Sequence, residues 1–236
     1  ELEAIKKVSF DIHAGEIFGI AGVAGNGQKE LAEAVTGLRK AIGGTITISG
    51  EDVTTQGAKA RVKKRVGFIP EDRLSMGLVP GMNMEENRIL KEYDTPRFSK
   101  NHILKKKVIH DTVQDEINRY AIKTAGDKSP VSLMSGGNQQ KLLVAREIGG
   151  DPVLLVAVYP SRGLDMGAAE AIHEILLEQC KKGVAVLLIS EELDELFQMS
   201  DRIGVLCSGE MMAVLDRNEA DYDTIGRLMS GERYEK

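Results

Sequence analysis

The stretch that decides the fold of this 236-residue chain is Gly22-Val23-Ala24-Gly25-Asn26-Gly27-Gln28-Lys29. It follows an apolar run at 17–21 and precedes a helical pattern that reaches about Leu38. This is the layout of a phosphate-binding loop, G-x-x-x-x-G-K-[ST], in which a glycine-rich turn between a strand and a helix cradles phosphate. The glycines fit the pattern, but Gln28 stands where lysine is expected, and Lys29 where the magnesium-binding Ser or Thr is expected. The sequence therefore predicts a cradle whose charge-holding groups have been replaced.

Composition and net charge limit the classes of protein to which the chain can belong. Hydrophobic residues make up 42% of the chain, which suits a globular core, and the formal charge is −5, which gives no electrostatic sign of a nucleic-acid partner. No stretch approaches the ~20 apolar residues of a membrane span, so a membrane role would act through partner subunits. Cys180 and Cys207 lack metal-ligand spacing and are expected to be buried free thiols in a reducing compartment. The chain shows no signal peptide and begins without Met inside a strand-like segment, so we expect a fragment of a longer protein.

Strand and helix patterns alternate at both ends of the chain. Strands are expected at 4–12, 17–21, 45–49, 66–69, 153–158 and 184–189, with two more within 202–215. The apolar runs 153–158 and 184–189 suit parallel strands covered on both faces, and a helical stripe separates them. The pattern predicts an open α/β sheet with right-handed crossovers, followed by a last helix near 224–229.

The middle of the chain differs from both ends. Residues 84–120 are charged, lack strand-like runs and have a helical period, and Pro96 separates two helical pieces. We therefore expect residues 82–134 to form a helical subdomain inserted into the α/β core.

A second motif, Met134-Ser135-Gly136-Gly137-Asn138-Gln139-Gln140-Lys141, opens another helical pattern. Ser135 is placed to cap that helix, and the two glycines let backbone N–H groups approach an anion. Taken alone, the motif is equally typical of an ordinary capped helix. The glycine loop upstream and Arg162-Gly163-Leu164-Asp165 downstream favour a nucleotide-associated role.

The order of these motifs resembles the nucleotide-binding domain of ABC transporters over essentially the whole chain, 1–236, with Ser-Gly-Gly-Asn matching the signature Ser-Gly-Gly-Gln. Three motifs narrow the resemblance further: the glycine loop, Ile69-Pro70-Glu71-Asp72-Arg73 and the signature. Their residues are similar to those of the second, often degenerate, cassette of tandem ATPases that serve simple-sugar and nucleoside importers. The residues 154–165 are more similar to the group of these ATPases that serves nucleoside importers. The resemblance implies an ABC-type P-loop NTPase fold: an α/β core with a mainly parallel sheet, an antiparallel β part and an inserted helical subdomain.

The resemblance also assigns roles position by position. The nucleotide-binding positions are Gly22, Val23, Ala24, Gly25, Asn26, Gly27, Gln28, Lys29, Glu30 and Glu71, the last at the Q-loop glutamine. The signature is Ser135, Gly136, Gly137, Asn138 and Gln139. Val158 and Tyr159 replace the acidic Walker B pair, Asp165 lies in the D-loop, and Glu191 replaces the switch histidine. No catalytic residue and no metal ligand is assigned.

Several of these positions keep two interpretations. Lys29 either reaches a phosphate or lies on a solvated helix face, and Tyr159 either contacts nucleotide or only continues the strand. The acidic Glu71 belongs either to the nucleotide site or to a local ion-pair cluster with Asp72 and Arg73. Ser190 followed by Glu191 also fits a plain helix start.

The resemblance implies that this cassette supports catalysis in a partner. Its signature would complete the site of an N-terminal cassette in the same polypeptide, while its own site would bind ATP and Mg²⁺ weakly or not at all and hydrolyse little. Residues 77–87 and the helical subdomain would contact integral membrane permease subunits at the cytoplasmic face of the membrane. The alternatives are a fully active ATPase that uses Lys29, and a soluble ABC protein outside transport. The transported solute is not encoded in this chain.

Overall fold

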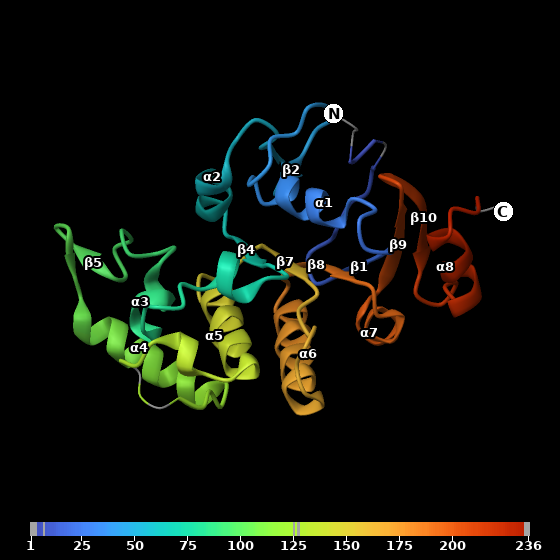
Figure 1. Cartoon of the computed structure of the whole chain (residues 1–236). Helices are drawn as coiled ribbons and strands as arrows, with labels where there is room; N and C mark the ends of the chain where they lie inside the picture. Colours follow the sequence, from blue (N-terminus) through green and yellow to red (C-terminus); the bar gives the residue numbers. More distant parts are fainter. Residues whose placement is uncertain (1–3, 7, 125, 127, 234–236) are drawn as a thin grey trace. The chain divides into compact units, whose positions relative to one another are not determined.

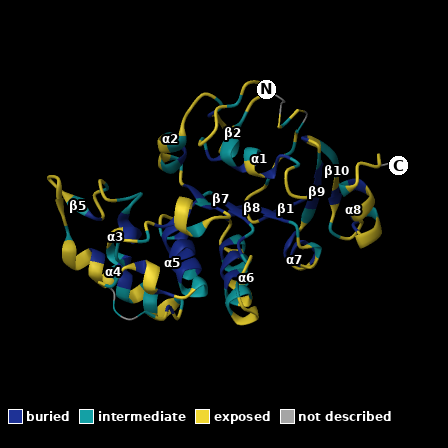
Figure 2. Cartoon of the chain, in the orientation of Figure 1, coloured by how far each residue is buried: buried dark blue, intermediate teal, exposed yellow. Residues whose placement is uncertain are grey.

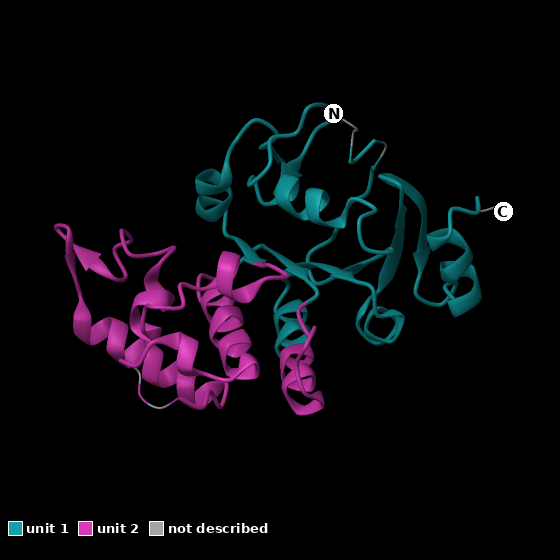
Figure 3. Cartoon of the chain, in the orientation of Figure 1, with its two compact units in different colours: residues 1–68, 152–159, 175–236 teal, residues 69–151, 160–174 magenta. Residues whose placement is uncertain are grey.

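The alternating apolar runs form one six-stranded sheet, in the order β10-β9-β1-β8-β7-β4, in the computed structural model (Figure 1). The structure describes residues 4–6, 8–124, 126 and 128–233. They form two units (Figure 3): residues 1–68, 152–159 and 175–236, and residues 69–151 and 160–174. Each unit is described separately below.

The first unit contains the sheet. Its strands are β1 (Ile17–Ala21), β4 (Val66–Ile69), β7 (Leu154–Val158), β8 (Ala185–Ser190), β9 (Arg202–Cys207) and β10 (Glu210–Asp216). β1 pairs in parallel with both β8 and β9, β7 pairs in parallel with β8, and β10 returns antiparallel to β9. A two-stranded ribbon of β2 (Thr47–Ile48) and β3 (Glu51–Asp52) and the helices α1 (Gln28–Val35), α2 (Ala58–Lys63), α7 (Leu193–Met199) and α8 (Tyr222–Met229) complete the unit.

Burial on both faces explains why these strands have unbroken apolar sequences. Alternate residues such as Phe18, Val156 and Leu187 form one core cluster with Leu31 of α1, and the central strands are buried throughout (Figure 2). Gly19 points to the opposite face, where a Cβ would lie 2.9 Å from a methyl carbon of Leu196 in α7. Apolar side chains are therefore needed at successive strand positions, as expected for a parallel sheet covered on both sides.

The second unit is mainly helical. It contains a π-helical turn at Arg73–Gly77, α3 (Met84–Ile89), α4 (Lys106–Arg119), a 3₁₀ turn at Val131–Leu133 and α5 (Gly136–Ile148). The short strands β5 (Ser99–Lys100) and β6 (Ile103–Leu104) pair as a hairpin. The first part of α6 (Met166–Lys181) belongs to this unit and the rest to the first unit.

The second unit contains a buried network of ion pairs around Arg88. The fully buried Arg88 of α3 lies 2.6 Å from a carboxylate oxygen of Glu92 and 2.6 Å from one of Glu116 in α4, and its guanidinium stacks on Phe98 at 5.4 Å from the ring centroid. Burial raises the pKa of Glu116 despite the opposing charge of Arg88. A buried charge that keeps its partner is tolerated, whereas one left alone is strongly destabilising.

The expected fold class is confirmed, but three local predictions were wrong. The described residues of 4–12 form no strand, because their alternating apolar side chains pack on the core, Phe10 stacking on Phe18 at 5.0 Å, without a backbone ladder. The middle of the chain does contain strands, the β5–β6 hairpin. Cys180 and Cys207 are free, as expected, but both are half-buried rather than buried. The boundaries 82–134 of a helical subdomain stay a prediction.

Candidate functional site

Three segments assigned to the nucleotide site leave the sheet at the same edge. The glycine loop follows β1, Tyr159 follows β7 and Glu191 follows β8, and these strands are neighbours in the order β1-β8-β7. Since the strands are parallel, their carboxyl ends meet at one edge, and the Tyr159 N–H donates to the Ile189 carbonyl at 2.8 Å. The first unit therefore brings these three parts of the expected site together, where open α/β sheets bind ligands.

The glycine loop has the backbone geometry of a phosphate cradle. Gly25 and Gly27 adopt φ of +88° and +107°, a region that side chains with a Cβ avoid. Asn26 fixes the loop from outside: its Oδ1 accepts the Ser208 N–H at 2.8 Å, and its carbonyl accepts the Gly209 N–H at 3.0 Å. The turn between β9 and β10 thus supports the loop, a contact that sequence spacing could not predict.

The lysine position holds a neutral side chain that is turned into the loop. Gln28 is 2% exposed, and its Nε2 donates to the Val23 carbonyl at 2.9 Å. Gly22 makes room for it, because a Cβ there would lie 2.5 Å from that nitrogen. The amide therefore closes the loop on itself, and the position carries no positive charge.

The next two side chains lie along α1 and form its surface ion pairs. Lys29 is 65% exposed, with Nζ 4.0 Å from a carboxylate oxygen of Glu33, while Glu30 lies 4.0 Å from Arg39. This geometry agrees with a solvated helix face for Lys29.

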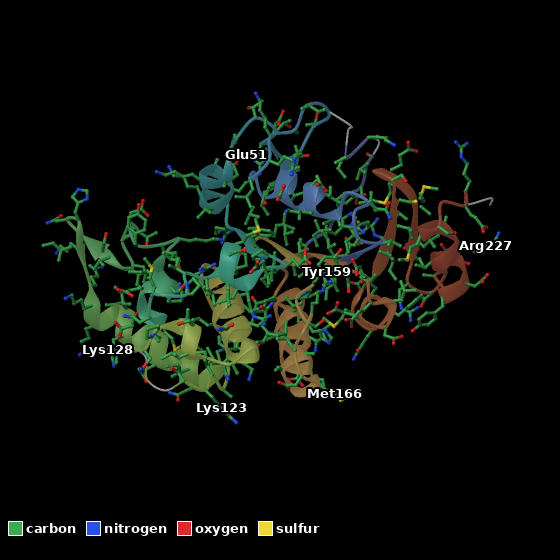
Figure 4. All side chains as sticks on the ribbon, in the orientation of Figure 1. Glu51, Lys123, Lys128, Tyr159, Met166 and Arg227 are labelled. Atoms are coloured by element: carbon green, nitrogen blue, oxygen red, sulfur yellow. The ribbon has the colours of Figure 1, made fainter. Side chains whose placement is uncertain are left out.

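The positions of the acidic pair and of the switch residue differ in burial and in the groups that they present. Val158 is 3% exposed within the core, and Tyr159 is half-buried against that core (Figure 4) with φ of +47°. Glu191 presents a buried Oε1 that has no hydrogen-bond partner in the described part of the chain. Magnesium in ATPase sites is usually held by one or two carboxylates together with waters and substrate phosphates. At these positions Val158 offers no oxygen ligand and Lys29 is a cation, whereas Glu191 offers a carboxylate.

The signature lies in the second unit, at the start of α5. Ser135 is exposed at the N-cap position, but its hydroxyl does not cap the helix, which corrects the expectation from the sequence. Instead the hydroxyl oxygen accepts a hydrogen bond from Asn138 Nδ2 at 2.7 Å, and Asn138 Oδ1 accepts the Lys123 backbone N–H at 2.7 Å. Gln139 is buried, and its amide bonds the Val131 and Met134 carbonyls at 3.1 Å each.

Neighbouring groups explain both signature glycines. A Cβ on Gly136 would lie 2.7 Å from a guanidinium nitrogen of Arg73, and a Cβ on Gly137 would lie 2.8 Å from the Ala168 Cβ in α6. Asp165, the D-loop position, caps the start of α6 by accepting the Ala168 N–H at 2.9 Å. The starts of α5 and α6 approach so closely because residue 137 has no side chain, whereas the Arg73 group beside Gly136 is the movable end of a long side chain.

Glu71, Asp72 and Arg73 have different partners in the second unit. Glu71 pairs with Arg162 at 2.5 Å, Asp72 accepts the N–H groups of Leu74 and Ser75, and Arg73 lies beside Gln139, its Nε 3.4 Å from Oε1. Hydrogen bonds from Ser75 first, and then from Leu74, lower the pKa of Asp72. Of the two interpretations of Glu71, the local ion-pair cluster with Asp72 and Arg73 is not supported, because Glu71 pairs with Arg162. The role of Glu71 in a nucleotide site stays a prediction. The partners Arg162 and Lys123 are separated from their contacts by long stretches of sequence, and no local signal identified them.

The family follows from these features together with sequence comparison. The sequence model of the family described as "ABC transporter" matches residues 5–157, more than half of the chain, so the chain belongs to the ABC transporter family. This family binds ATP together with Mg²⁺. Among solved structures, the dimeric ATP-binding cassette MJ0796 bound to ADP and Pi has a TM-score of 0.77 at 21% identity and covers 91% of this chain and 90% of its own.

The curated relatives are ATP-binding proteins of sugar and nucleoside import. The chain is 41% identical to the guanosine import ATP-binding protein NupO of Bacillus subtilis over 98% of its own length and 45% of the relative's. It is 38% identical to the glucose import ATP-binding protein TsgD13 of Haloferax volcanii, over 98% of this chain and 42% of that protein. The chain thus spans less than half the length of these relatives. No helix among the described residues is long and apolar enough to cross a membrane.

Proposed function

We propose that this chain is the second nucleotide-binding cassette of a two-cassette importer of simple sugars or nucleosides, and that its signature completes the ATP site of the first cassette. The proposal rests on one observation at the position where lysine is expected. The neutral Gln28 is buried there, and its amide donates a hydrogen bond to the backbone of the same loop. The chain's own cradle keeps its shape but lacks the cation, while Ser135 at the start of α5 stays exposed.

The cradle of this chain binds nucleotide weakly under this proposal. Hydrogen bonds to charged groups contribute roughly 1.5–3 kcal/mol and neutral ones about 1 kcal/mol, so replacing the lysine lowers affinity by roughly tenfold. Val158 and Tyr159 provide no carboxylate at the positions of the acidic pair, and the loss of general-base positioning removes roughly 10²–10⁴ in rate. The backbone N–H groups and the dipole of α1 still favour an anion.

The names of the relatives support a role in uptake. NupO and TsgD13 are named as import ATP-binding proteins, for guanosine and for glucose, and the chain matches less than half of each. We therefore assign to this protein an N-terminal cassette in the same polypeptide, permease subunits in the membrane, and a peripheral location at the cytoplasmic face. Residues 1–236 are then one cassette, with 82–134 as its helical subdomain.

Steady-state ATPase activity of the full-length protein with its membrane subunits tests the proposal. Ser135→Ala removes the signature hydroxyl and is expected to lower the activity roughly tenfold or more, since a hydrogen bond to a charged phosphate is lost. Ser132→Ala is a matched control, because Ser132 is exposed in the preceding turn. Full activity of the Ser135→Ala protein would overturn the proposal. ATP turnover by the isolated chain that disappears in Lys29→Ala would instead show an active cassette, and copurification with ribosomes would exclude a transporter role.

A further inference from the structure

We propose that Asn138 is a positioning residue that sets the Ser135 hydroxyl as a hydrogen-bond donor toward the phosphate of a nucleotide held by the partner cassette. This inference rests on the proposed function and assigns to one signature side chain a task that acts through another. Two consecutive hydrogen bonds, from Lys123 to Asn138 and from Asn138 to Ser135, carry the argument, and the proposed ligand would complete a third.

The first bond fixes which end of the Asn138 amide faces which neighbour. The backbone N–H of Lys123 lies 2.7 Å from Asn138, and a backbone N–H only donates, so the amide atom that meets it is the oxygen Oδ1. The NH₂ group therefore points the other way. Lys123 follows the left-handed Ala121, whose φ is +48°, in the turn after α4, so that turn holds the amide.

The second bond fixes the role of the Ser135 oxygen. Asn138 Nδ2 lies 2.7 Å from Ser135 Oγ, and an amide nitrogen donates but does not accept. The serine oxygen is the acceptor in this contact, and its own proton points away from Asn138. Chains of hydrogen bonds polarise one another, so accepting from the amide makes the hydroxyl a better donor.

The third bond is the one that the ligand completes. Ser135 is exposed at the N-cap of the 13-residue α5, where backbone N–H groups without helical partners and the helix dipole favour an anion. Phosphate oxygens only accept hydrogen bonds. A hydroxyl already preset as a donor therefore loses less freedom when the phosphate arrives.

The length of the side chain at residue 138 suits this task. Asn138 is the third residue of α5 counted from the cap, the position from which a longer Glu or Gln reaches back to the backbone N–H of the cap residue. Asparagine is one methylene shorter and meets the side chain of the cap residue instead.

A double-mutant cycle in the full-length protein with its membrane subunits tests the inference, with kcat/KM for ATP as the readout. Asn138→Ala is expected to lower kcat/KM roughly fivefold in the native background, the effect of one neutral hydrogen bond, and to change nothing when Ser135 is already alanine. A merely structural role of Asn138 would give additive losses.

Asn138→Asp gives the sharper comparison, because it is nearly isosteric. It keeps the acceptor for the Lys123 N–H but puts an acceptor against Ser135, which draws the serine proton inward. We expect a larger loss than with Asn138→Ala, approaching that of Ser135→Ala. Asn118→Asp is the control, since it adds the same charge at an exposed position of α4 in the same unit.

The outcomes separate the two proposals. Additive losses, or an Asn138→Asp protein as active as the native one, would overturn the role of Asn138 while a large Ser135→Ala effect still supported the proposed function. Unchanged activity of Ser135→Ala would remove both proposals.

Discussion

Placing a lysine at position 28 is the most direct test of the proposal that the cradle binds nucleotide weakly. Gln28 is 2% exposed and donates to the Val23 carbonyl at 2.9 Å from inside the glycine loop. In the Gln28→Lys protein the ammonium group reaches the same carbonyl and also places a positive charge at the phosphate position. The loop keeps its glycine backbone, so the change isolates the charge.

The expected gain follows from hydrogen-bond energies. Replacing a neutral bond of about 1 kcal/mol by a charged one of roughly 1.5–3 kcal/mol strengthens ATP binding by roughly 0.5–2 kcal/mol, a decrease in Kd of about 2- to 30-fold. Because the gain is electrostatic, it shrinks as salt is raised and the Debye length falls from ~10 Å at 0.1 M. ATP hydrolysis stays low, since Val158 and Tyr159 are unchanged.

The assay is a titration of the chain with Mg-ATP, following the backbone amide signals of Gly22, Gly25 and Gly27 by NMR. Gln28→Met is the matched control, because it has similar length but neither a polar hydrogen nor a charge. We expect Kd to rise in the order Lys, Gln, Met at residue 28. A Gln28→Lys protein that binds ATP no more tightly than the native chain would refute the argument that the missing cation weakens the cradle.

Three further predictions concern stability, measured as the free energy of unfolding in urea. Gly137→Ala is expected to cost about 1–3 kcal/mol, because the new Cβ would lie 2.8 Å from the Ala168 Cβ; an unchanged midpoint would contradict this packing. Arg88→Met leaves Glu116 buried without its partner and costs about 3–5 kcal/mol at pH 7. Burial raises the folded-state pKa of Glu116 above its unfolded value even with Arg88 present, and removal of Arg88 raises it further. The destabilisation of the Arg88→Met protein is therefore largest where Glu116 is ionised and shrinks as the pH is lowered and the carboxyl group binds a proton, and a loss independent of pH would contradict the assignment. Asn26→Ala removes the side-chain oxygen that accepts the Ser208 N–H in the β9–β10 turn and costs about 1 kcal/mol. An unchanged hydrogen-exchange rate of the Ser208 amide would be inconsistent with this contact.

Much of the fold could be predicted from local sequence. The apolar runs became β1, β4, β7 and β8 within one residue of the expected bounds, because strands covered on both faces must be apolar throughout. The segment 4–12, whose apolar residues alternate with polar ones, was also expected to be a strand, but its described residues form none. Its apolar side chains cover the core as a strand would, and only the backbone partners, which lie elsewhere in the chain, distinguish the two cases.

The candidate site shows the same division. Spacing located the glycine loop and the signature as short motifs beside a strand or helix, and the family resemblance assigned Val158, Tyr159 and Glu191. The roles of these positions stay predictions. Spacing could not assign Ser135 its partner, because the helix cap and the bond to Asn138 are both compatible with the same four residues. It also missed Arg162, which pairs with Glu71 across 91 positions of sequence.

By itself, the sequence determined the class of fold, the glycine-rich turn after the run 17–21 and the neutral residue at position 28, since these depend on the order of apolar runs and on residue type at short spacing. The tertiary structure alone decided what the replacing groups do. Gln28 is buried and bonded to Val23, and Asn138 is held by a turn 15 residues earlier in the chain. Hydrogen bonds of this kind depend on distance and direction between segments that only folding brings together, so no local pattern encodes them.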